Sequence, residues 1–568
     1  MRYLIVGGVA GGATVAARLR RLDEKAEITI FEKGEYVSYA NCGLPYYIGN
    51  VIPERDQLFV QTVEGITSRY DIDIRIKTEV LSINREEKSI LVKNLSNGEV
   101  VKEHYDKLIL SPGAEPLKPP VPGIESNKIF TLRNVPDTDK IKNYIKNNSI
   151  RSAIVVGGGF IGLEMAENLR HLGIKTDLVE MAPQVMAQLD YSMASIVHLE
   201  LEAKGVKLHL GESVEEFRES GSYIEAVLKG GKGIFADMVI WSIGVKPDTV
   251  LARESGLELG RTGGIKVNEY LQTSDKDIYA LGDAVEVLNL VSGNASLIPL
   301  AGPANKMGRI AADNIVLGNT SKYTGSIGTG IAKVFDLTVA SAGLSGKALE
   351  RDGIPHIDSF THSASHAGYY PNALPLSIKI AFSPGDGRLL GAQVVGFEGV
   401  DKRIEMFASV IKSGGTIYDL MELEHAYAPP FSSAKDPVNM SGFVADNILK
   451  GRVKIASWRE IERLNSETDI LIDVRTAEEN KVATIPGSVN IPLDELRFRL
   501  DEIPDNKRII VYCAVGMRGY LASRILMQNG FENVFNLSGG YKTYSVATGQ
   551  PAAIQYFAVK ITSGDQIE

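Results

Sequence analysis

The chain has 568 residues, of which 44% are hydrophobic and 23% charged, with a formal net charge of −9. This length predicts about three to five domains, and the acidic balance argues against a nucleic-acid partner while leaving room for small anionic ligands in basic pockets. Because no apolar run reaches the roughly 18 residues of a membrane span and MRYLIVGG is no signal peptide, we expect a cytoplasmic protein without a membrane partner.

Strands and helices alternate up to about residue 250, which predicts βαβ units with parallel sheets. YLIVGGVAGGATVAARLRRL followed by ITIFEK reads as strand, glycine turn, helix and strand, and SAIVVGGGFIGLEMAENLRHLG followed by TDLVE repeats the pattern from residue 152. Two such units predict two dinucleotide sites in an α/β fold. Residues 321–445 read as an α+β domain, and the stretch from about 456 reads as a further α/β unit.

The second glycine turn matches a dinucleotide-binding pattern. Gly157, Gly159 and Gly162 fit G-x-G-x-x-G between a strand and a helix, which permits close approach of a pyrophosphate. Glu180 ends the next strand, where it can accept hydrogen bonds from both ribose hydroxyls and would repel a 2′-phosphate. We therefore favour NADH and keep NADPH as an alternative; a glycine turn without any ligand is the structural alternative.

The first turn matches the pattern less closely, because a valine stands at the second glycine position. The candidate cofactor residues are the turn Gly7, Gly8, Val9, Ala10 and Gly11, and Glu32 and Lys33 at the end of the next strand. Asp283, in the strand end YALGDA, is a further candidate because its carboxylate can face a flavin's ribityl chain. Its alternative role is to cap a helix.

Residues 1 to about 445 resemble the pyridine nucleotide-disulfide oxidoreductases in the order of these parts. The resemblance implies FAD at the first unit, NAD(P)H at the second and a homodimer. It implies an FAD-binding domain over 1–115 and 250–320, an NAD(P)H-binding domain over 116–249, a dimerisation domain over 321–445, a linker over 446–455 and a last domain over 456–568.

Cys42 lies in SYANCGLPYY, where this family usually carries two cysteines, and the only other cysteine is Cys513. A solitary cysteine beside a flavin can cycle through a sulfenic acid, or it can form a mixed disulfide with an outside thiol. A buried structural cysteine is the third alternative. Single-cysteine peroxidases and oxidases of this family carry a histidine where this chain has Ala10, which argues against the sulfenic acid.

The segments SASHAGYYPN (363–372) and AYAPPF followed by KD resemble the coenzyme A-disulfide reductases. The resemblance implies that Tyr369 and Tyr427 lie near the redox sulfur of the partner subunit, with Tyr370 as the alternative to Tyr369. His425 is an alternative base, although a structural role is more usual.

Coenzyme A is anionic, and Arg18 and Arg21 share one helix face, where a solvated basic face is the alternative. The resemblance assigns coenzyme A contacts to Thr14, Arg18, Arg21, Ser38 and Asn41, and more weakly to Asn305 and Lys435.

The C-terminal stretch resembles a rhodanese domain, from DILIDVRTAEEN with Asp473 and Arg475 to the loop Cys513–Arg518. Backbone N–H groups in such a loop stabilise a thiolate or persulfide. A phosphatase-like loop would have one more residue before its arginine, and an inactive rhodanese copy is the other alternative.

The sequence therefore predicts a flavin- and NADH-dependent reductase of coenzyme A disulfide or persulfide, with polysulfide or sulfur handled through the rhodanese domain. The alternatives are an NADH oxidase or peroxidase and a non-catalytic sulfane-sulfur sensor. No metal site is expected. The physiological substrate stays open, as does whether Cys513 passes sulfur directly or through coenzyme A.

Overall fold

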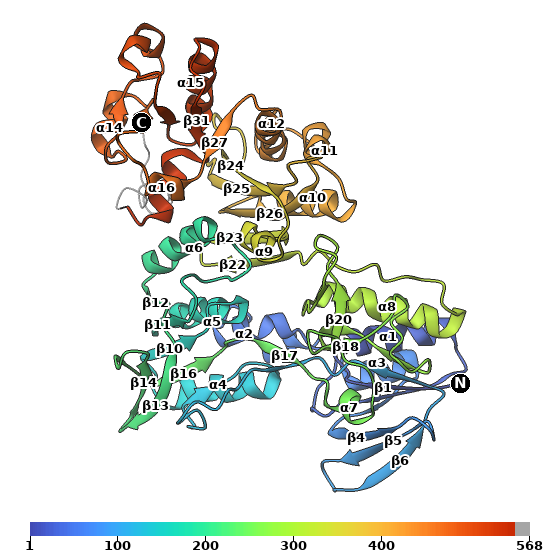
Figure 1. Ribbon diagram of the computed structural model, residues 1–568. Helices are drawn as coiled ribbons and strands as arrows, with labels where there is room; N and C mark the ends of the chain where they lie inside the picture. Colours follow the sequence, from blue (N-terminus) through green and yellow to red (C-terminus); the bar gives the residue numbers. More distant parts are fainter. Residues whose placement is uncertain (551–568) are drawn as a thin grey trace. The chain divides into compact units, whose positions relative to one another are not determined.

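The structure is a computed structural model that describes residues 1–550, and the chain folds into two compact units (Figure 1). The first unit comprises Met1–Pro183 and Gly205–Gly328, and the second comprises Gln184–Lys204 together with the chain from Thr329 onward. Both predicted nucleotide units lie in the first unit. The predicted α+β and rhodanese stretches lie in the second, together with one helix from the 116–249 stretch.

The first unit is built on two five-stranded parallel sheets. Their strand orders are β19-β7-β1-β2-β3 and β12-β11-β10-β16-β9. The strands of the first are β1 (Arg2–Val6), β2 (Glu27–Phe31), β3 (Asp73–Arg75), β7 (Lys107–Leu110) and β19 (Ile278–Ala280). Those of the second are β9 (Ile129–Phe130), β10 (Ser152–Val156), β11 (Lys175–Glu180), β12 (Val206–Leu210) and β16 (Met238–Trp241). Both β1 and β10 are nearly continuous buried apolar runs, because helices cover both faces of such a sheet.

The helices of the first unit follow the strands as the sequence predicts. They are α1 (Ala10–Leu22), α2 (Leu44–Ile48), α3 (Val63–Tyr70), α4 (Val135–Asn147), α5 (Phe160–His171), α7 (Val250–Glu254) and α8 (Ala301–Leu317), with short 3₁₀ turns η1 (Asn41–Gly43), η2 (Arg55–Leu58) and η3 (Gly282–Ala284). Helix α1 packs along α8, and α2 packs on α5 (Figure 1). The second of these contacts joins the Cys42 segment to the helix of the second glycine turn.

Smaller sheets complete the first unit. They are β4 (Thr78–Asn84), β5 (Ser89–Asn94) and β6 (Val100–His104); β13 (Val214–Ser220), β14 (Tyr223–Leu228) and β15 (Gly233–Ala236); β8 (Ala114–Pro116) with β17 (Val245–Pro247); and β18 (Ile265–Lys266), β20 (Val285–Leu288) and β21 (Ala295–Ser296). The strand β8 pairs with β17. The chain passes through β8 on its way from the first nucleotide fold to the second, and through β17 on its way back.

The second unit begins with an antiparallel sheet in the order β22-β23-β26-β25-β24, as the hairpin-like pattern of 321–445 predicts. Its strands are β22 (Gly330–Val334), β23 (Leu337–Gly343), β24 (Ile357–Ala364), β25 (Pro375–Phe382) and β26 (Leu389–Gly396). Its helices are α6 (Tyr191–Ala203), α9 (Gly346–Arg351), α10 (Val400–Lys412), α11 (Ile417–Glu422) and α12 (Pro437–Leu449). The strand β24 leads into the Tyr369 segment, and α11 and α12 flank the Tyr427 segment.

A parallel sheet in the order β27-β31-β30-β28-β29 forms the C-terminal α/β part. Its strands are β27 (Lys454–Ala456), β28 (Asp469–Asp473), β29 (Val489–Asn490), β30 (Arg508–Tyr512) and β31 (Val534–Leu537); its helices are α13 (Trp458–Ile461), α14 (Ala477–Val482), α15 (Met517–Gln528) and α16 (Gly540–Ala547), with turns η4 (Leu496–Phe498) and η5 (Leu500–Glu502). The central strand β30 ends directly before Cys513, which places this cysteine at the carboxyl edge of the sheet.

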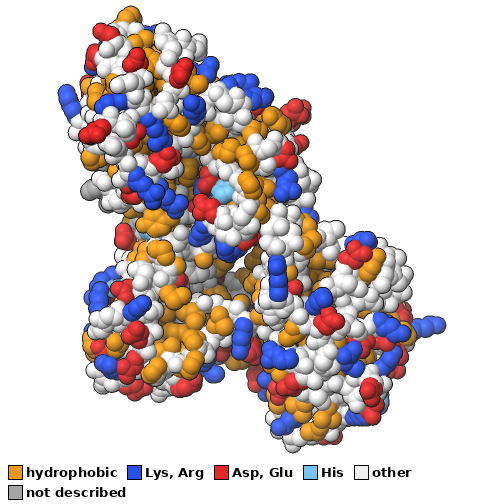
Figure 2. Space-filling view, viewed as in Figure 1, with side chains coloured by type: hydrophobic (Ala, Val, Ile, Leu, Met, Phe, Trp, Pro, Cys, Tyr) orange, Lys and Arg blue, Asp and Glu red, His pale blue; other side chains and the backbone are white. Residues whose placement is uncertain are grey.

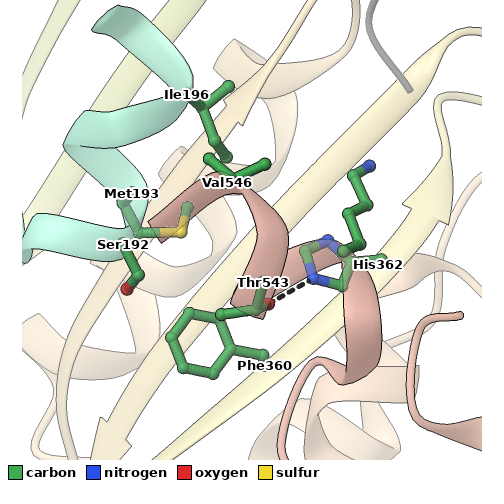
Figure 3. Close-up of a pocket in the computed structure, with 8 residues that line it drawn as sticks. Ser192, Met193, Ile196, Phe360, His362, Thr543 and Val546 are labelled. Carbon is green, nitrogen blue, oxygen red and sulfur yellow. Dashed lines mark hydrogen bonds between the residues drawn. The ribbon is translucent and has the colours of Figure 1, made fainter. Parts of the chain in front are cut away.

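Helix α16 joins the C-terminal part to the rest of the second unit. It packs on α6, and the Nε2 of His362 on β24 lies 2.8 Å from the Thr543 hydroxyl (Figure 3). The His362 Nδ1 lies 2.9 Å from the Ser377 hydroxyl, so both ring nitrogens have partners. Burial lowers the pKa of the neighbouring Lys542 to about 8. Through α16, the C-terminal part therefore contacts both α6 and β24.

On the face drawn in Figure 2, lysine and arginine side chains lie among aspartates and glutamates without a continuous basic patch. Within residues 1–550, no helix is both long and apolar enough to cross a membrane.

Candidate active site

The two glycine turns have the same construction. Gly7 has φ of +93° and Gly157 has φ of +109°, a backbone conformation that side-chain-bearing residues rarely adopt. A Cβ at Gly7 would lie 2.2 Å from the Ser111 carbonyl oxygen, and one at Gly157 would lie 2.3 Å from that of Ser242. Each first glycine is therefore required by its own conformation and by the neighbouring strand of its sheet.

The last glycine of each turn permits close packing of helix against strand. A Cβ at Gly12 would lie 1.8 Å from the Gly7 carbonyl oxygen, and one at Gly162 would lie 1.9 Å from that of Gly157. This matched geometry shows that Gly12 takes the third glycine role in the first turn. Among the three glycine positions of the pattern, the two turns differ only at the middle one, where Val9 precedes α1 and Gly159 precedes α5.

At that middle position, a Cβ on Gly159 would meet no atom within 4 Å. The protein itself therefore leaves open space where the G-x-G-x-x-G pattern brings a pyrophosphate close to the backbone. Val9 fills the corresponding place in the first turn, where it precedes α1 without a side-chain cap. The second turn therefore has room for a dinucleotide in close contact with its backbone. At the first turn, a dinucleotide would have to lie beside the Val9 side chain.

Both acidic residues are fixed by backbone hydrogen bonds. Glu32 accepts from the Gly8 N–H and the Gly34 N–H, each at 2.8 Å. Glu180 accepts from the Gly158 N–H at 2.6 Å and the Ala182 N–H at 2.8 Å. Each carboxylate is thus held at the carboxyl end of its strand beside its glycine turn, the place where an acidic residue meets a ribose in this kind of site.

The other two cofactor candidates of the first turn differ in surroundings. Lys33 forms a 2.7 Å ion pair with Glu79, and that hydrogen bond raises the pKa of Lys33. Asp283 lies in η3, next to the strand that ends beside Gly11: a Cβ on Gly11 would lie 2.3 Å from Leu281. Burial raises the pKa of Asp283, and Arg133 partly offsets this. The structure therefore brings Asp283 to the first turn and directs Lys33 to a glutamate.

The Cys42 segment is tied to the first turn. The Ser38 N–H donates to the Gly8 carbonyl at 3.0 Å, and Ser38 has a left-handed φ of +48°. The Ala40 N–H donates to the Leu58 carbonyl at 2.8 Å, and η1 then presents Cys42 with an exposed side chain. This cysteine is accessible beside a nucleotide site, which argues against the buried structural role.

Two carboxylates affect the pKa of Cys42 through their charge. Although the side chain is accessible, the surrounding protein removes part of the water around the sulfur, which raises the pKa of the Cys42 thiol, and Glu164 and Asp283 raise it further. Glu164 lies on α5, and burial together with Glu167 raises its pKa to about 7. Sequence reasoning missed Glu164, since its proximity to Cys42 depends on the packing of α2 on α5; its place two residues after Gly162 was the one available signal.

The coenzyme A candidates of the first unit lie on α1 and α8, in η1 and, for Ser38, in the loop before η1. The Thr14 hydroxyl donates to the Asn305 side chain at 2.8 Å. Arg18 pairs with Asp313 at 2.7 Å, and Arg21 is exposed. The buried Asn41 amide oxygen has no hydrogen-bond partner in the described residues, which marks it as a group that a ligand can satisfy. Lys435, the remaining candidate, lies exposed in the second unit.

The two tyrosine segments meet in the second unit. The Tyr369 and Tyr427 hydroxyls lie 2.8 Å apart, and the side chains are 77% and 47% exposed. Their hydrogen bond raises the pKa of Tyr369. Tyr370 instead packs its ring against His366, at 5.7 Å between centroids. The geometry thus pairs Tyr427 with Tyr369 and gives Tyr370 a packing role.

The Cys513 loop has the form of an anion cradle. Cys513 is buried, and the Gly516 N–H donates to its sulfur at 3.1 Å. Gly516 has φ of +113° and directly precedes α15, and this conformation accompanies the hydrogen bond from its N–H to the sulfur. Arg518 forms two hydrogen bonds to Glu479, at 2.6 and 2.7 Å. Such a loop stabilises a thiolate or persulfide through its N–H groups.

Asp473 and Arg475 form a buried ion pair at 2.7 Å below this loop, which is a structural role.

Two cavities of the second unit, of about 10 and 210 Å³, contain neither cysteine in their linings. Figure 3 shows the smaller one, between α6, β24 and α16. Within residues 1–550, no group of three or more His, Cys, Asp or Glu residues is arranged to hold a metal ion.

Comparison with protein families gives three matches along the chain. Residues 1–308 match the model of the pyridine nucleotide-disulphide oxidoreductase family, and residues 330–437 match the dimerisation domain of the same family. Residues 458–547 match the rhodanese-like domain. These matches confirm the predicted fold class and the predicted order of the parts.

Known proteins resemble the chain over most of its length. The coenzyme A disulfide reductase of Staphylococcus aureus strain JH9 is 37% identical over 445 residues, which are 78% of this chain and 99% of that protein. The reduced Bacillus anthracis CoADR-RHD structure is 52% identical with a TM-score of 0.95, over 97% of this chain and 98% of that one. An NAD-dependent persulfide reductase from A. fulgidus is 39% identical with a TM-score of 0.89, over 96% and 100%.

Proposed function

Because the chain belongs to the pyridine nucleotide-disulphide oxidoreductase family, we propose that it is a flavoprotein that uses NADH to reduce coenzyme A disulfide and coenzyme A persulfide through Cys42. The observation that carries this proposal is the solitary, exposed Cys42, tied to the first nucleotide turn through Ser38. One cysteine cannot form an internal disulfide there, so the second sulfur comes from the substrate. The similarity to a coenzyme A disulfide reductase and a persulfide reductase supports the same substrates.

The family's order of parts, rather than the glycine turns themselves, assigns FAD to the first turn and the nicotinamide nucleotide to the second. The first turn with Glu32 and Asp283 would hold FAD, and the second turn with Glu180 would hold NADH. NADH and FAD, when bound, supply two electrons to the Cys42 disulfide. NADPH is the less favoured donor, since its 2′-phosphate would face the carboxylate that Gly158 and Ala182 hold in place.

The sulfur chemistry of Cys42 has two steps. The Cys42 thiolate attacks coenzyme A disulfide, giving the mixed disulfide and one coenzyme A thiolate; with coenzyme A persulfide it releases hydrosulfide instead. Two electrons and one proton then convert the mixed disulfide into the Cys42 thiolate and free coenzyme A thiol. Thr14, Arg18, Arg21, Ser38, Asn41 and Asn305, with Lys435 as a contact from the second unit, hold the coenzyme A moiety.

The tyrosine pair handles the proton. In the proposed homodimer, Tyr369 and Tyr427 act at Cys42 of the other subunit, where a phenol, protonated at neutral pH, can donate to the departing thiolate. The match to the family's dimerisation domain supports this assembly. We place the protein in the cytoplasm, because its chemistry needs two reduced cysteines.

The rhodanese domain supplies sulfane sulfur. The Cys513 thiolate attacks the outer sulfur of a polysulfide and takes one zero-valent sulfur, giving a persulfide and a polysulfide shorter by one sulfur. Coenzyme A thiolate then attacks the outer sulfur of the Cys513 persulfide, which yields coenzyme A persulfide and regenerates the Cys513 thiolate. The mobile sulfur thus reaches Cys42 on coenzyme A, and the Gly516 N–H stabilises the anion at each stage.

Steady-state NADH oxidation by Cys42→Ser and Cys513→Ser tests this division of labour. We expect Cys42→Ser to retain FAD and to lose turnover of coenzyme A disulfide, coenzyme A persulfide and polysulfide. Cys513→Ser should lose polysulfide turnover in the presence of coenzyme A while it retains turnover of preformed coenzyme A persulfide. Hydrogen peroxide as the best wild-type substrate would favour the oxidase or peroxidase alternative. Equal losses in Cys513→Ser with both sulfur substrates would place Cys513 inside the reductase step.

A further inference from the structure

Two loops carry the tyrosine pair, and each is closed at its own base. The Tyr369 loop, residues 365–374, is closed by the Ser365 N–H, which donates to the Leu374 carbonyl at 2.7 Å, and by the Leu374 N–H, which donates to the Ser365 hydroxyl at 3.1 Å. Inside it, the His366 Nε2 lies 3.1 Å from the Pro371 carbonyl oxygen. This loop is therefore an internally bonded unit at the end of β24.

The Tyr427 loop, residues 423–436, is anchored at both ends to α12. The Asn439 side-chain amide donates to the Leu420 and Leu423 carbonyl oxygens, at 3.0 and 3.1 Å, which fixes the start of the loop. Asp436 ends the loop and caps α12, accepting from the Val438 N–H at 3.0 Å. The tyrosine lies between these two fixed points.

One buried arginine joins the bases of the two loops. The Arg403 guanidinium, on α10, donates through Nη2 to the Ser365 carbonyl at 2.8 Å and to the Asp436 carboxylate at 3.0 Å. Its Nη1 donates to the Gly399 carbonyl at 3.0 Å. Arg403 and Asp436 are both 1% exposed. Two hydrogen bonds join the loops directly: the Ala367 N–H donates to the Ser432 carbonyl at 3.1 Å, and the Tyr369 and Tyr427 hydroxyls lie 2.8 Å apart.

The Arg403–Asp436 contact is an ion pair at neutral pH. Burial alone would raise the pKa of Asp436, but hydrogen bonds from Ser432, the Val438 N–H and Arg403 lower it below its usual value. A guanidinium with three oriented contacts in a buried site is a rigid connection, since its planar fork fixes the direction of each bond. The exposed phenol rings have far less packing to hold them.

We propose that Arg403 is a positioning residue for disulfide reduction, which sets the separation of the two loops and so keeps the Tyr369 and Tyr427 hydroxyls within hydrogen-bonding distance. This inference rests on the proposed role of the tyrosine pair. It adds a residue that touches neither coenzyme A nor Cys42, and that neither sequence motif contains.

A double-mutant cycle tests it with coenzyme A disulfide as the substrate. Arg403→Lys keeps a positive charge opposite Asp436 but replaces the planar fork by a shorter ammonium group. We expect kcat to fall about 10-fold in Arg403→Lys and about 10²-fold in Tyr427→Phe. The variant with both changes should be no slower than Tyr427→Phe, because the loop geometry no longer matters without the Tyr427 hydroxyl. Reduction of bound FAD by NADH should be unchanged in all four proteins.

The matched control is Arg20→Lys. Arg20 is also buried, and it donates to the backbone carbonyl oxygens of Tyr70 and Ala26 in the first unit. We expect it to lower thermal stability without changing the effect of Tyr427→Phe. If Arg403→Lys fails to fold, Arg403→Gln with Asp436→Asn replaces it, since that pair keeps hydrogen bonds without buried charge.

The outcomes separate the two proposals. An unchanged kcat in Tyr427→Phe would remove the tyrosine from the proposed function, whatever Arg403→Lys does. A slow Tyr427→Phe together with an unchanged kcat in the Arg403 variant would overturn the positioning role. An equal fractional loss from the Arg403 change with and without the Tyr427 hydroxyl would overturn it as well, because it would show a general structural effect.

Discussion

At the scale of single residues, the proposed preference for NADH over NADPH depends on Glu180. Its carboxylate is fixed by the Gly158 and Ala182 N–H groups, so it cannot turn away from a 2′-phosphate without losing two hydrogen bonds. The proposed preference for NADH therefore rests on a carboxylate that two backbone N–H groups hold in place.

We predict that the enzyme has a higher kcat/KM for NADH than for NADPH, and that Glu180→Gln narrows the ratio about 10-fold, which corresponds to ~1.4 kcal/mol. The amide keeps the shape of the side chain and removes the charge that repels the phosphate. Steady-state kinetics with both nucleotides measure the ratio, and Glu215→Gln, an exposed change on β13, is the control. A ratio that Glu180→Gln leaves unchanged would contradict this interpretation of Glu180.

The sequence was sufficient to identify the residues whose chemistry depends on local spacing. Gly157, Gly162 and Glu180 follow from a strand–turn–helix–strand pattern, and Cys42 follows from its rarity and its setting. Glu164 and Arg403 could not be found in this way. Their roles depend on which helix packs beside which loop, and a glutamate or an arginine in a helix carries no mark of that contact.

At the scale of elements, the second glycine turn has one glycine, Gly159, that the packing of the protein does not require, and one, Gly162, that it does. A side chain on Gly159 would meet no protein atom, whereas one on Gly162 would collide with the Gly157 carbonyl. Val9 occupies the equivalent place before α1. The same chain therefore has one helix start with a side chain at this position and one without.

We predict that Gly159→Ala weakens NADH use with little effect on stability. Gly159 has φ of −80°, which alanine adopts without strain, and the new methyl group would point into the space left for the pyrophosphate. KM for NADH should rise about 10-fold or more, while FAD content and the melting temperature stay unchanged.

Gly162→Ala is the contrasting variant, because its Cβ would need the helix start to move away from the strand. We expect it to lower the melting temperature or the yield of folded protein. An unchanged KM for NADH in folded Gly159→Ala would show that the nucleotide does not pass close to this position.

The element order was predictable to a large extent, since strand and helix periodicity mark βαβ units and hairpins without knowledge of their neighbours. The boundaries were less so. Helix α12 extends to Leu449 and β27 begins at Lys454, so only residues 450–453 of the expected linker 446–455 lie between them. Helix α6 belongs to the second unit by its contacts, because its apolar residues pack on α16 and on the antiparallel sheet.

At the scale of the whole molecule, one chain combines an oxidoreductase part with a rhodanese-like domain, and each part contains one of the two cysteines. The four residues 450–453 leave the rhodanese domain little freedom from α12, and α16 is bonded to β24 through Thr543 and His362. Tethering raises the effective concentration of a Cys513 persulfide near its acceptor without any new contact. The proposed carrier of this sulfur to Cys42 is coenzyme A.

The central claim is that Cys42 borrows its second sulfur from coenzyme A. Intact-protein mass spectrometry tests it most directly, on enzyme reduced with NADH, then treated with coenzyme A disulfide and acid-quenched. We predict one added coenzyme A per subunit, mapped to Cys42 by peptide analysis, removed by NADH and absent from Cys42→Ser. An unmodified Cys42, a sulfenic acid there, or an adduct confined to Cys513 would contradict the account.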